Sequence, residues 1–275
     1  MTLSERGSGS GSYAATDGSA YQRFIGRWTR RLADPLIAFA GPLLDGPLLD
    51  VGTGTGSVVA ALRVAESSKE ITGIDVAEPY LAYARERADC DGATFVQQDA
   101  ASLDLPDDHF AAAFSCIVMN FLKEPAKALS EMRRVVMPGG MIASAVWDFR
   151  GGLVYQRMLW DTVASIDPTA AATRDRIFSA TLGLPNGMVN LWQAEGLEDV
   201  TRESLTIRMD FSNFADYWEP LLGGQGPVGG YVASLDPDMQ TRVREAISAA
   251  FLAGAPDGER SLTATAWAVK GRVPA

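Results

Sequence analysis

Three glycines at alternate positions, Gly52, Gly54 and Gly56, directly follow the strand-like segment Leu48–Val51. Glycine is used where the backbone turns sharply or approaches a ligand without a Cβ in the way. Small and apolar residues at 57–62 then favour a helix. A strand, a glycine-rich turn and a helix in this order predict a nucleotide-type site at the carboxyl end of the strand.

The glycine spacing argues against a dinucleotide cofactor. A dinucleotide fingerprint needs its third glycine where this chain has Ser57, one residue after Gly56. The chain also lacks a Tyr-x-x-x-Lys pair, and its single histidine, His109, is expected at the opposite edge of the sheet from the site. A nicotinamide-dependent dehydrogenase is therefore disfavoured.

An acidic residue ends the second predicted strand. Asp75 follows the strand-like segment Glu70–Ile74, about 20 residues after the glycines, where a carboxylate can accept hydrogen bonds from both hydroxyls of a ribose. The same contact is expected for any cofactor that contains a ribose. Asp75 therefore indicates a ribose and leaves the identity of the cofactor open.

The segments that follow identify a family. A third strand at 93–97 leads to Asp99, a fourth strand runs over 114–119, a helix covers Pro125–Val136, and Pro138-Gly139-Gly140 precedes a fifth strand at 141–147. With the motif Asp-Val-Gly-Thr-Gly-Thr-Gly, this order resembles the class I S-adenosylmethionine-dependent methyltransferases. The resemblance covers roughly 48–149 and is closest to the ubiquinone/menaquinone-biosynthesis-like branch that acts on small molecules.

The resemblance implies an α/β fold, a Rossmann-like seven-stranded, mostly parallel sheet with an antiparallel last strand and helical cap insertions. It implies S-adenosyl-L-methionine as the cofactor and S-adenosyl-L-homocysteine as the product. In this family the carboxylate at the position of Asp99 receives the adenine amino group, and the amide of the next residue meets the ring. The expected cofactor-binding residues are Asp50, Gly52, Thr53, Gly54, Gly56, Asp75, Val76, Asp99, Ala100, Cys116, Tyr21 and Trp28.

Tyr21 and Trp28 belong to an N-terminal segment that the family folds over the cofactor as a lid. The pattern predicts two amphipathic helical turns interrupted near Gly26, followed by a helix to Phe39. Residues seven apart share a face of a continuous helix. Two interpretations remain for this pair, namely contact with the methionine end of the cofactor or packing on the core.

The domain organisation expected from the sequence is a flexible N-terminus (1–12), a helical lid (13–45) and a methyltransferase domain (46–275). Within this domain we expect a core (46–149), a cap insertion (about 150–186) and a second helical insertion (about 211–255). The sixth strand is expected at Glu198–Asp210 and the last at Ser261–Lys270. The stretch Gly223–Gly230 is expected to be a loop without a phosphate-binding role, since no strand precedes it.

Composition limits the partners. A formal net charge of −10 and a pI of about 4.7 disfavour nucleic acid and anionic membranes, and favour a small neutral or cationic substrate. Two cysteines cannot form a zinc or disulfide framework, so no metal is expected. No run of about 20 apolar residues and no secretory signal are visible, which favours a cytoplasmic protein. A monomer or a homodimer is compatible with the sequence.

Methyl transfer from a sulfonium is an in-line displacement, for which positioning alone supplies much of the rate. No nucleophile–base pair stands out, so no catalytic residue is assigned. The residues expected to face the acceptor follow the fourth and fifth strands, namely Asn120, Phe121, Trp147 and Phe149. The leading hypothesis is methyl transfer to O, N or C of a small apolar or aromatic metabolite. The alternative is a member of this fold that binds the cofactor without methylating.

Overall fold

The computed structural model describes residues 17–275. The predicted flexible segment 1–12 and the first four residues of the predicted lid lie outside the described residues. Within residues 17–275, seven strands form one sheet in the order β3-β2-β1-β4-β5-β7-β6. They are β1 Leu48–Val51, β2 Ile71–Asp75, β3 Thr94–Gln97, β4 Phe110–Cys116, β5 Val136–Trp147, β6 Glu198–Phe211 and β7 Arg260–Arg272.

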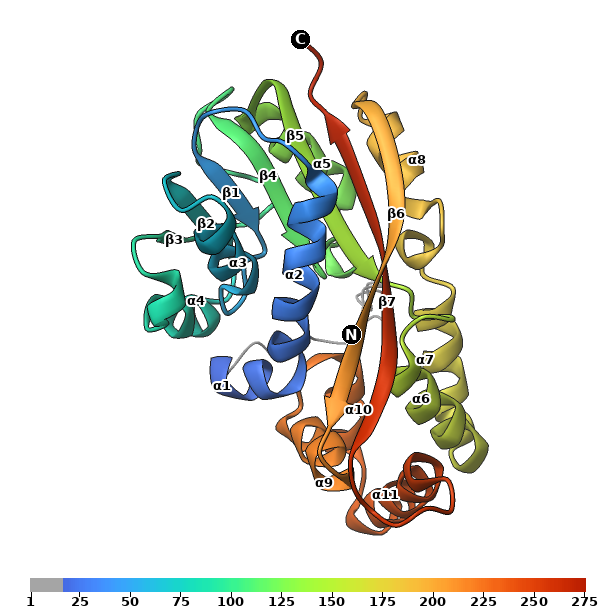
Figure 1. The fold of residues 1–275 in the computed structure, drawn as a ribbon. Helices are drawn as coiled ribbons and strands as arrows, with labels where there is room; N and C mark the ends of the chain where they lie inside the picture. Colours follow the sequence, from blue (N-terminus) through green and yellow to red (C-terminus); the bar gives the residue numbers. More distant parts are fainter. Residues whose placement is uncertain (1–16) are drawn as a thin grey trace, which may run out of the picture.

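β7 alone runs against its neighbours. It pairs antiparallel with β5 on one side and with β6 on the other, whereas β1 to β5 pair in parallel. The sheet therefore confirms the predicted Rossmann-like fold with an antiparallel last strand (Figure 1).

Both faces of the sheet are covered by helices, as a parallel sheet requires. Leu48 packs into the cluster beneath α2 (Arg27–Ala40), α3 (Ser57–Ala65) and α4 (Glu78–Arg85), while its neighbour Leu49 packs into the other cluster. That second cluster lies beneath α5 (Pro125–Val135) and α8 (Gly187–Ala194). Adjacent residues of a strand point to opposite faces, which explains why β1 is buried along its whole length.

The order of the strands opens a crevice between β1 and β4. The chain leaves β1 toward β2 and β3, and then returns across the sheet to β4 and β5. The loops after β1 and β4 consequently diverge at their carboxyl ends. Ligands of open α/β sheets bind at such a switch point.

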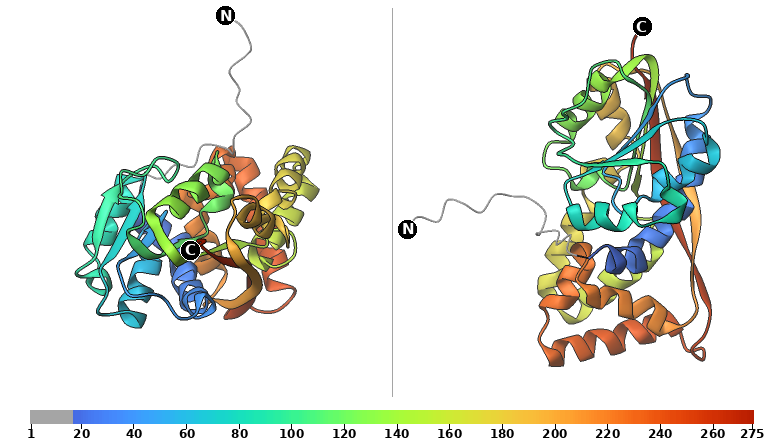
Figure 2. Two further views of the ribbon diagram at one scale, coloured as in Figure 1. Left: turned by 90° about the horizontal axis from the view of Figure 1, so that it is seen from above. Right: turned by 90° about the vertical axis from the view of Figure 1, so that its left-hand side faces the viewer.

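β6 and β7 continue as a two-stranded ribbon beyond the end of β5. The last β5 pair is Trp147 with Ala266, yet β6 and β7 remain paired to Phe211 and Arg260. The ribbon leads to a helical cap at the carboxyl edge of the sheet (Figure 1; Figure 2, right). The cap helices are α6 Val154–Ile166, α7 Pro168–Phe178, α9 Phe214–Trp218, α10 Gly226–Ser234 and α11 Pro237–Leu252.

The two segments predicted as insertions, 150–186 and 211–255, supply these helices. They form one cap, since α6 packs against α11.

The predicted interruption near Gly26 is a π-helix. Residues Gln22–Gly26 join α1 (Gly18–Tyr21) to α2 without a break. A π-turn contains more residues than an α-turn, so it rotates the helix that follows it. The seven-residue spacing of Tyr21 and Trp28 therefore does not place them on one face, because it applies only to a regular helix.

The prediction of a loop at Gly223–Gly230 is wrong for most of the stretch. Gly223 ends a 3-10 helix that begins at Glu219, and α10 starts at Gly226. Pro227 suits a first helical turn, where its missing N–H has no partner to lose. At Gly229 a Cβ would come within 2.8 Å of the backbone of Gly224, so close packing accounts for a glycine inside this helix.

The packing of α2 on the sheet gives a stability prediction. The side chain of Leu36 is fully buried, so Leu36→Ala leaves a cavity and is expected to cost about 2–5 kcal/mol of unfolding free energy in urea titrations. The half-buried Ile37 on the same helix provides the control, because Ile37→Ala is expected to cost less. Equal losses at the two positions would contradict this packing of α2.

Candidate active site

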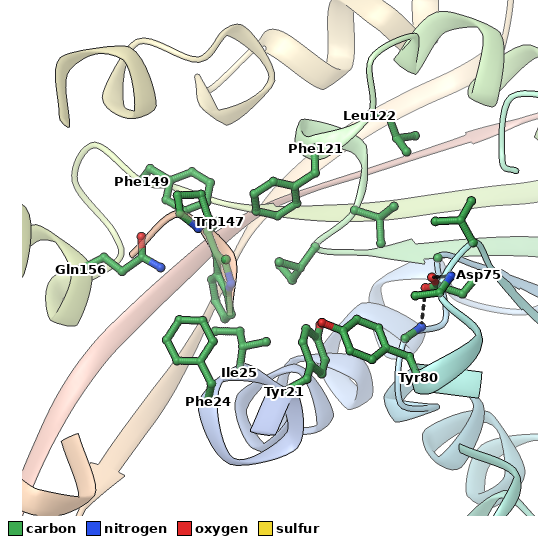
Figure 3. A pocket seen from close by; sticks show the side chains of 18 residues that line it. Tyr21, Phe24, Ile25, Asp75, Tyr80, Phe121, Leu122, Trp147, Phe149 and Gln156 are labelled. Atoms are coloured by element: carbon green, nitrogen blue, oxygen red, sulfur yellow. Dashed lines mark hydrogen bonds between the residues drawn. The ribbon is translucent and has the colours of Figure 1, made fainter. Parts of the chain in front are cut away.

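A cavity of about 290 Å³ lies at the carboxyl ends of β1, β2, β4 and β5, under the cap. Figure 3 shows Asp75 and Tyr80 at one end, and Phe24, Trp147, Phe149 and Gln156 at the other. The lining residues are Tyr21, Phe24, Ile25, Gly52, Gly54, Asp75, Val76, Ala77, Tyr80, Ile117, Val118, Phe121, Leu122, Trp147, Phe149, Gln156, Gly226 and Pro227.

Asp75 is the anionic group of this cavity. Its Oδ2 accepts a hydrogen bond of 2.9 Å from the amide of Gly54, and its Oδ1 accepts one of 2.9 Å from the amide of Ala77. Burial raises the pKa of Asp75, and the backbone hydrogen bonds oppose this rise. A carboxylate has about four acceptor positions, so each oxygen keeps one for a ligand hydroxyl.

The glycine turn forms a wall without side chains. Gly52 has a φ of +73°, and a Cβ there would lie 2.5 Å from the side chain of Val118. The amides of Gly52 and Thr53 both donate to the carbonyl of Ile74 at 2.8 Å. The turn is thus tied to β2 and leaves room only for a residue that lacks a Cβ.

Two tyrosines cover the turn from the lid and from α4. The ring of Tyr21 lies 3.6 Å from where a Cβ of Gly54 would stand, and its centroid is 4.7 Å from that of Tyr80. The Tyr80 hydroxyl donates a buried hydrogen bond of 2.8 Å to Oε1 of Gln225, just before α10. This bond links the core to the cap at the rim of the cavity.

The opposite end of the cavity is apolar and aromatic. The rings of Phe121 and Phe149 meet edge to face at 6.4 Å. Trp147, from the end of β5, and Gln156, from α6, supply the polar atoms there, and none of the described lining residues at this end is charged. We call this part of the cavity, formed by Phe24, Ile25, Phe121, Trp147, Phe149 and Gln156, the aromatic chamber.

Ile117 carries backbone strain between these two ends. Its φ of +62° places a β-branched residue in the left-handed region, which such residues rarely adopt. The conformation is held by a hydrogen bond of 2.8 Å from its amide to the carbonyl of Ala145. Strain of this kind concentrates at functional sites.

Comparison with known proteins assigns the fold to a family. Residues 49–144 match the family described as "Methyltransferase domain". The chain is 35% identical over 118 residues to a demethylmenaquinone methyltransferase of Thermus thermophilus, covering 42% of this chain and 52% of the relative. It is 33% identical over 137 residues to a malonyl-[acyl-carrier protein] O-methyltransferase of Methylococcus capsulatus, covering 49% and 50%.

Residues 49–144 therefore form a domain of the class I methyltransferase family. This match confirms the predicted family for the matched domain, and S-adenosylmethionine is the cofactor of that family. The matched part spans about half the length of both curated relatives.

A solved phosphoethanolamine N-methyltransferase 2 of Haemonchus contortus, in complex with S-adenosyl-L-methionine, shares the fold. The TM-score is 0.57 at 16% identity, and the match covers 95% of this chain and 58% of that one.

The site residues predicted from the sequence fall into two groups. Eight of them line the cavity: Tyr21, Gly52, Gly54, Asp75, Val76, Phe121, Trp147 and Phe149. The others do not: Asp50, Thr53, Gly56, Asp99, Ala100, Cys116, Trp28 and Asn120.

Several of the predicted residues outside the cavity make contacts within the protein. Trp28 is 3% exposed and stacks at 5.3 Å on Phe211 of the ribbon, and Gly56 caps α3. Asp99 is exposed and accepts a hydrogen bond of 2.9 Å from the amide of Ala101. Burial raises the pKa of the Cys116 thiol, which keeps this side chain neutral.

Sequence reasoning missed ten lining residues. Ile117 and Val118 directly follow β4, which ends at Cys116 and not at the predicted Met119. Gln156, Gly226 and Pro227 come from the cap, where no local pattern indicates a pocket. The remaining five are Phe24, Ile25, Ala77, Tyr80 and Leu122.

Several large aromatic residues after the predicted core (46–149) are buried in the protein and do not line the cavity. Trp160 is fully buried against Tyr231, and Trp218 stacks on Phe214. Trp192 donates to the carbonyl of Ile142 at 3.3 Å on the other face of the sheet.

Neither a membrane-spanning helix nor a metal site is found within residues 17–275. The described helices include none with the length and apolar character that a bilayer crossing requires. The same part of the chain brings no three His, Cys, Asp or Glu side chains together as metal ligands.

Asp50 is a buried acid in β1, two residues before the glycine turn. Its side chain is 1% exposed, and neither carboxyl oxygen has a hydrogen-bond partner among the described residues. Burial raises the pKa of Asp50 to about 7. The charge of Asp75 also raises this pKa, whereas the nearby Thr53 hydroxyl opposes the increase. Between about pH 4 and pH 7, Asp50 is therefore protonated in the folded protein and ionised in the unfolded chain, where its pKa is 3.8.

Asp50→Asn is expected to flatten the pH dependence of stability. Because the folded state binds the extra proton, Asp50 lowers the unfolding free energy as the pH rises from about 4 to about 7. A shift of this size corresponds to roughly 4 kcal/mol at most. In urea titrations at about pH 5 and about pH 8, the variant should gain stability relative to wild type at the higher pH. The control Asp99→Asn, at an exposed position, should show the same pH dependence of stability as wild type. If Asp50→Asn also showed the wild-type pH dependence, the raised pKa of Asp50 would be refuted.

Proposed function

We propose that the chain transfers a methyl group from S-adenosylmethionine to O, N or C of a small, uncharged, apolar or aromatic metabolite. The observation that carries the proposal is Asp75. Each of its oxygens is oriented by one backbone amide, while the carboxylate faces a cavity at the switch point of the sheet. The aromatic chamber at the far end then provides the acceptor site.

The residues at the Asp75 end fit the cofactor. Asp75 has acceptor positions left for ribose hydroxyls, and the glycine turn lets a chain pass without meeting a Cβ. Val76 is 61% exposed although it is apolar, which suits a residue that an adenine ring covers. When bound, the cofactor supplies a methyl group on a positively charged sulfur.

The chain contributes positioning in this proposal. Tyr21 and the glycine turn confine the cofactor side of the cavity, and the aromatic chamber holds the acceptor. The described lining residues include no His, Lys or Glu, and burial raises the pKa of Tyr21 far above its usual range. The acceptor must therefore provide its own nucleophile, and its proton, where it has one, leaves to solvent.

The names of the similar proteins do not identify the methyl acceptor of this chain. One similar protein is named for demethylmenaquinone and another for a malonyl-acyl carrier protein, which differ in size and charge. The formal charge of −10 disfavours a nucleic-acid substrate here, since phosphates require a basic surface. The uncharged chamber supports a neutral small molecule, and we propose that the protein acts as a monomer or homodimer in the cytoplasm.

Asp75→Ala tests the cofactor assignment by isothermal titration calorimetry. We expect wild type to bind S-adenosylmethionine, and the variant to bind it roughly 10- to 100-fold more weakly, because charge-assisted hydrogen bonds to the ribose are lost. Asp75→Asn, which keeps one acceptor oxygen, should fall between the two. Asp91→Ala, an exposed position away from the cavity, serves as the control and should bind as wild type does.

Two results would contradict the proposal. Binding of NADH in preference to S-adenosylmethionine would overturn the cofactor. Cofactor binding without S-adenosylhomocysteine formation, across a panel of neutral aromatic phenols, amines and enols, would favour the non-methylating alternative.

A further inference from the structure

The aromatic chamber contains a buried hydrogen-bond donor without a partner. The Trp147 side chain is 1% exposed, and its indole N–H finds no acceptor among the described residues. Indole N–H only donates, so it can be satisfied only by an acceptor atom. Leaving such a group unpaired is costly, and this one lines a cavity that a ligand can enter.

Two other tryptophans of the described residues resemble Trp147 but lie elsewhere. Trp160 and Trp267 also have buried N–H groups without a partner, but neither residue lines the cavity. No ligand in the cavity can satisfy them. Of the three, only Trp147 stands where an incoming molecule can supply the missing acceptor.

Gln156 is a second polar group of the chamber, and the cap holds it in place. It is 7% exposed, and its Nε2 donates to the hydroxyl of Tyr155 at 2.9 Å. The carbonyl of Tyr155 in turn accepts a hydrogen bond of 2.8 Å from the hydroxyl of Tyr217. Gln156 thus lines the cavity while one end of its amide is held by Tyr155. Figure 3 shows Gln156 and Trp147 together at the end away from Asp75.

We propose that Trp147 and Gln156 are the specificity-determining pair of the acceptor site and bind a hydroxyl or carbonyl oxygen on an uncharged ring compound. The inference rests on the proposed function, in which the aromatic chamber is the acceptor site. The oxygen accepts from the indole of Trp147, and the Gln156 amide accepts from or donates to the same group. The rings of Phe121 and Phe149 cover the apolar part of the molecule.

The chemistry of the chamber excludes charged acceptors. A carboxylate would be desolvated with no cationic side chain among the described residues that line the cavity. An ammonium would face the N–H of Trp147 without giving it an acceptor. An uncharged ring with an oxygen satisfies both the donor and the apolar wall.

Three probes that share one ring system test the pair, namely 1-naphthol, naphthalene and 1-naphthoate. Their affinities are measured by tryptophan fluorescence with and without saturating S-adenosylhomocysteine. We expect wild type to prefer 1-naphthol over naphthalene by about 3- to 10-fold, the value of one hydrogen bond, and to bind 1-naphthoate most weakly. Trp147→Phe should abolish the preference for 1-naphthol, and Gln156→Leu should reduce it.

Trp160→Phe is the matched control, since it removes an equally buried and unpaired indole N–H outside the cavity. It should keep the preference of wild type. Because Trp147→Phe also alters a buried site, the indole N–H resonances of wild-type protein provide a second measurement. The Trp147 signal should shift downfield with 1-naphthol and not with naphthalene.

The possible results separate this inference from the proposed function. If S-adenosylhomocysteine binds but Trp147→Phe still prefers 1-naphthol over naphthalene, Trp147 and Gln156 are not the specificity-determining pair. The cofactor assignment then stands. If wild type does not bind 1-naphthol, or binds 1-naphthoate more tightly, the substrate class is wrong. If S-adenosylhomocysteine does not bind, the proposed function fails, while the probe ratios without it still decide the role of Trp147.

Discussion

The hydrogen bonds between the glycine turn and β2 are the constraint on which the site depends. Gly52 and Thr53 donate to the carbonyl of Ile74, and Gly54 donates to the carboxylate of Asp75. These bonds fix a turn whose positive φ angles and close contact with Val118 admit only glycine. The same bonds orient the carboxylate toward the cavity. One local network thus shapes the wall of the cofactor side and presents its anionic group.

The acceptor side depends instead on tertiary contacts between the cap and the core. The Tyr80 hydroxyl binds Gln225, and Arg27 of α2 forms an ion pair of 2.7 Å with Asp216 of α9. These contacts place the start of α10 over the cavity. The core therefore holds the elements expected at a cofactor, while the cap completes the aromatic chamber, the proposed acceptor site.

This separation explains how much could be predicted from the sequence. The sheet, the glycine turn and the position of Asp75 follow from local patterns, because strand, turn and helix are each encoded within a few residues. Tyr80 and Gln156 lie in helices whose periodicity reports burial alone, so nothing marks them as cavity residues. Trp28 was expected near the cofactor from a spacing that assumes a regular helix, whereas a π-helix precedes it and its ring lies against Phe211.

The antiparallel last strand has a functional consequence in this arrangement. β7 pairs with Trp147 at the end of β5, and an isolated bridge joins its Ala264 to Leu153 just before α6. The amide of Asp148 also donates to Thr265 of β7 at 3.0 Å. Trp147 and Gln156 are therefore held by the same strand from both sides of one short loop. A displacement of about 1 Å can reduce a positioning-dependent rate by about 100-fold, so a shared rigid support matters for the proposed transfer, which relies on positioning. β7 supplies that support for the aromatic chamber, as the tie to β2 does for the Asp75 end of the cavity.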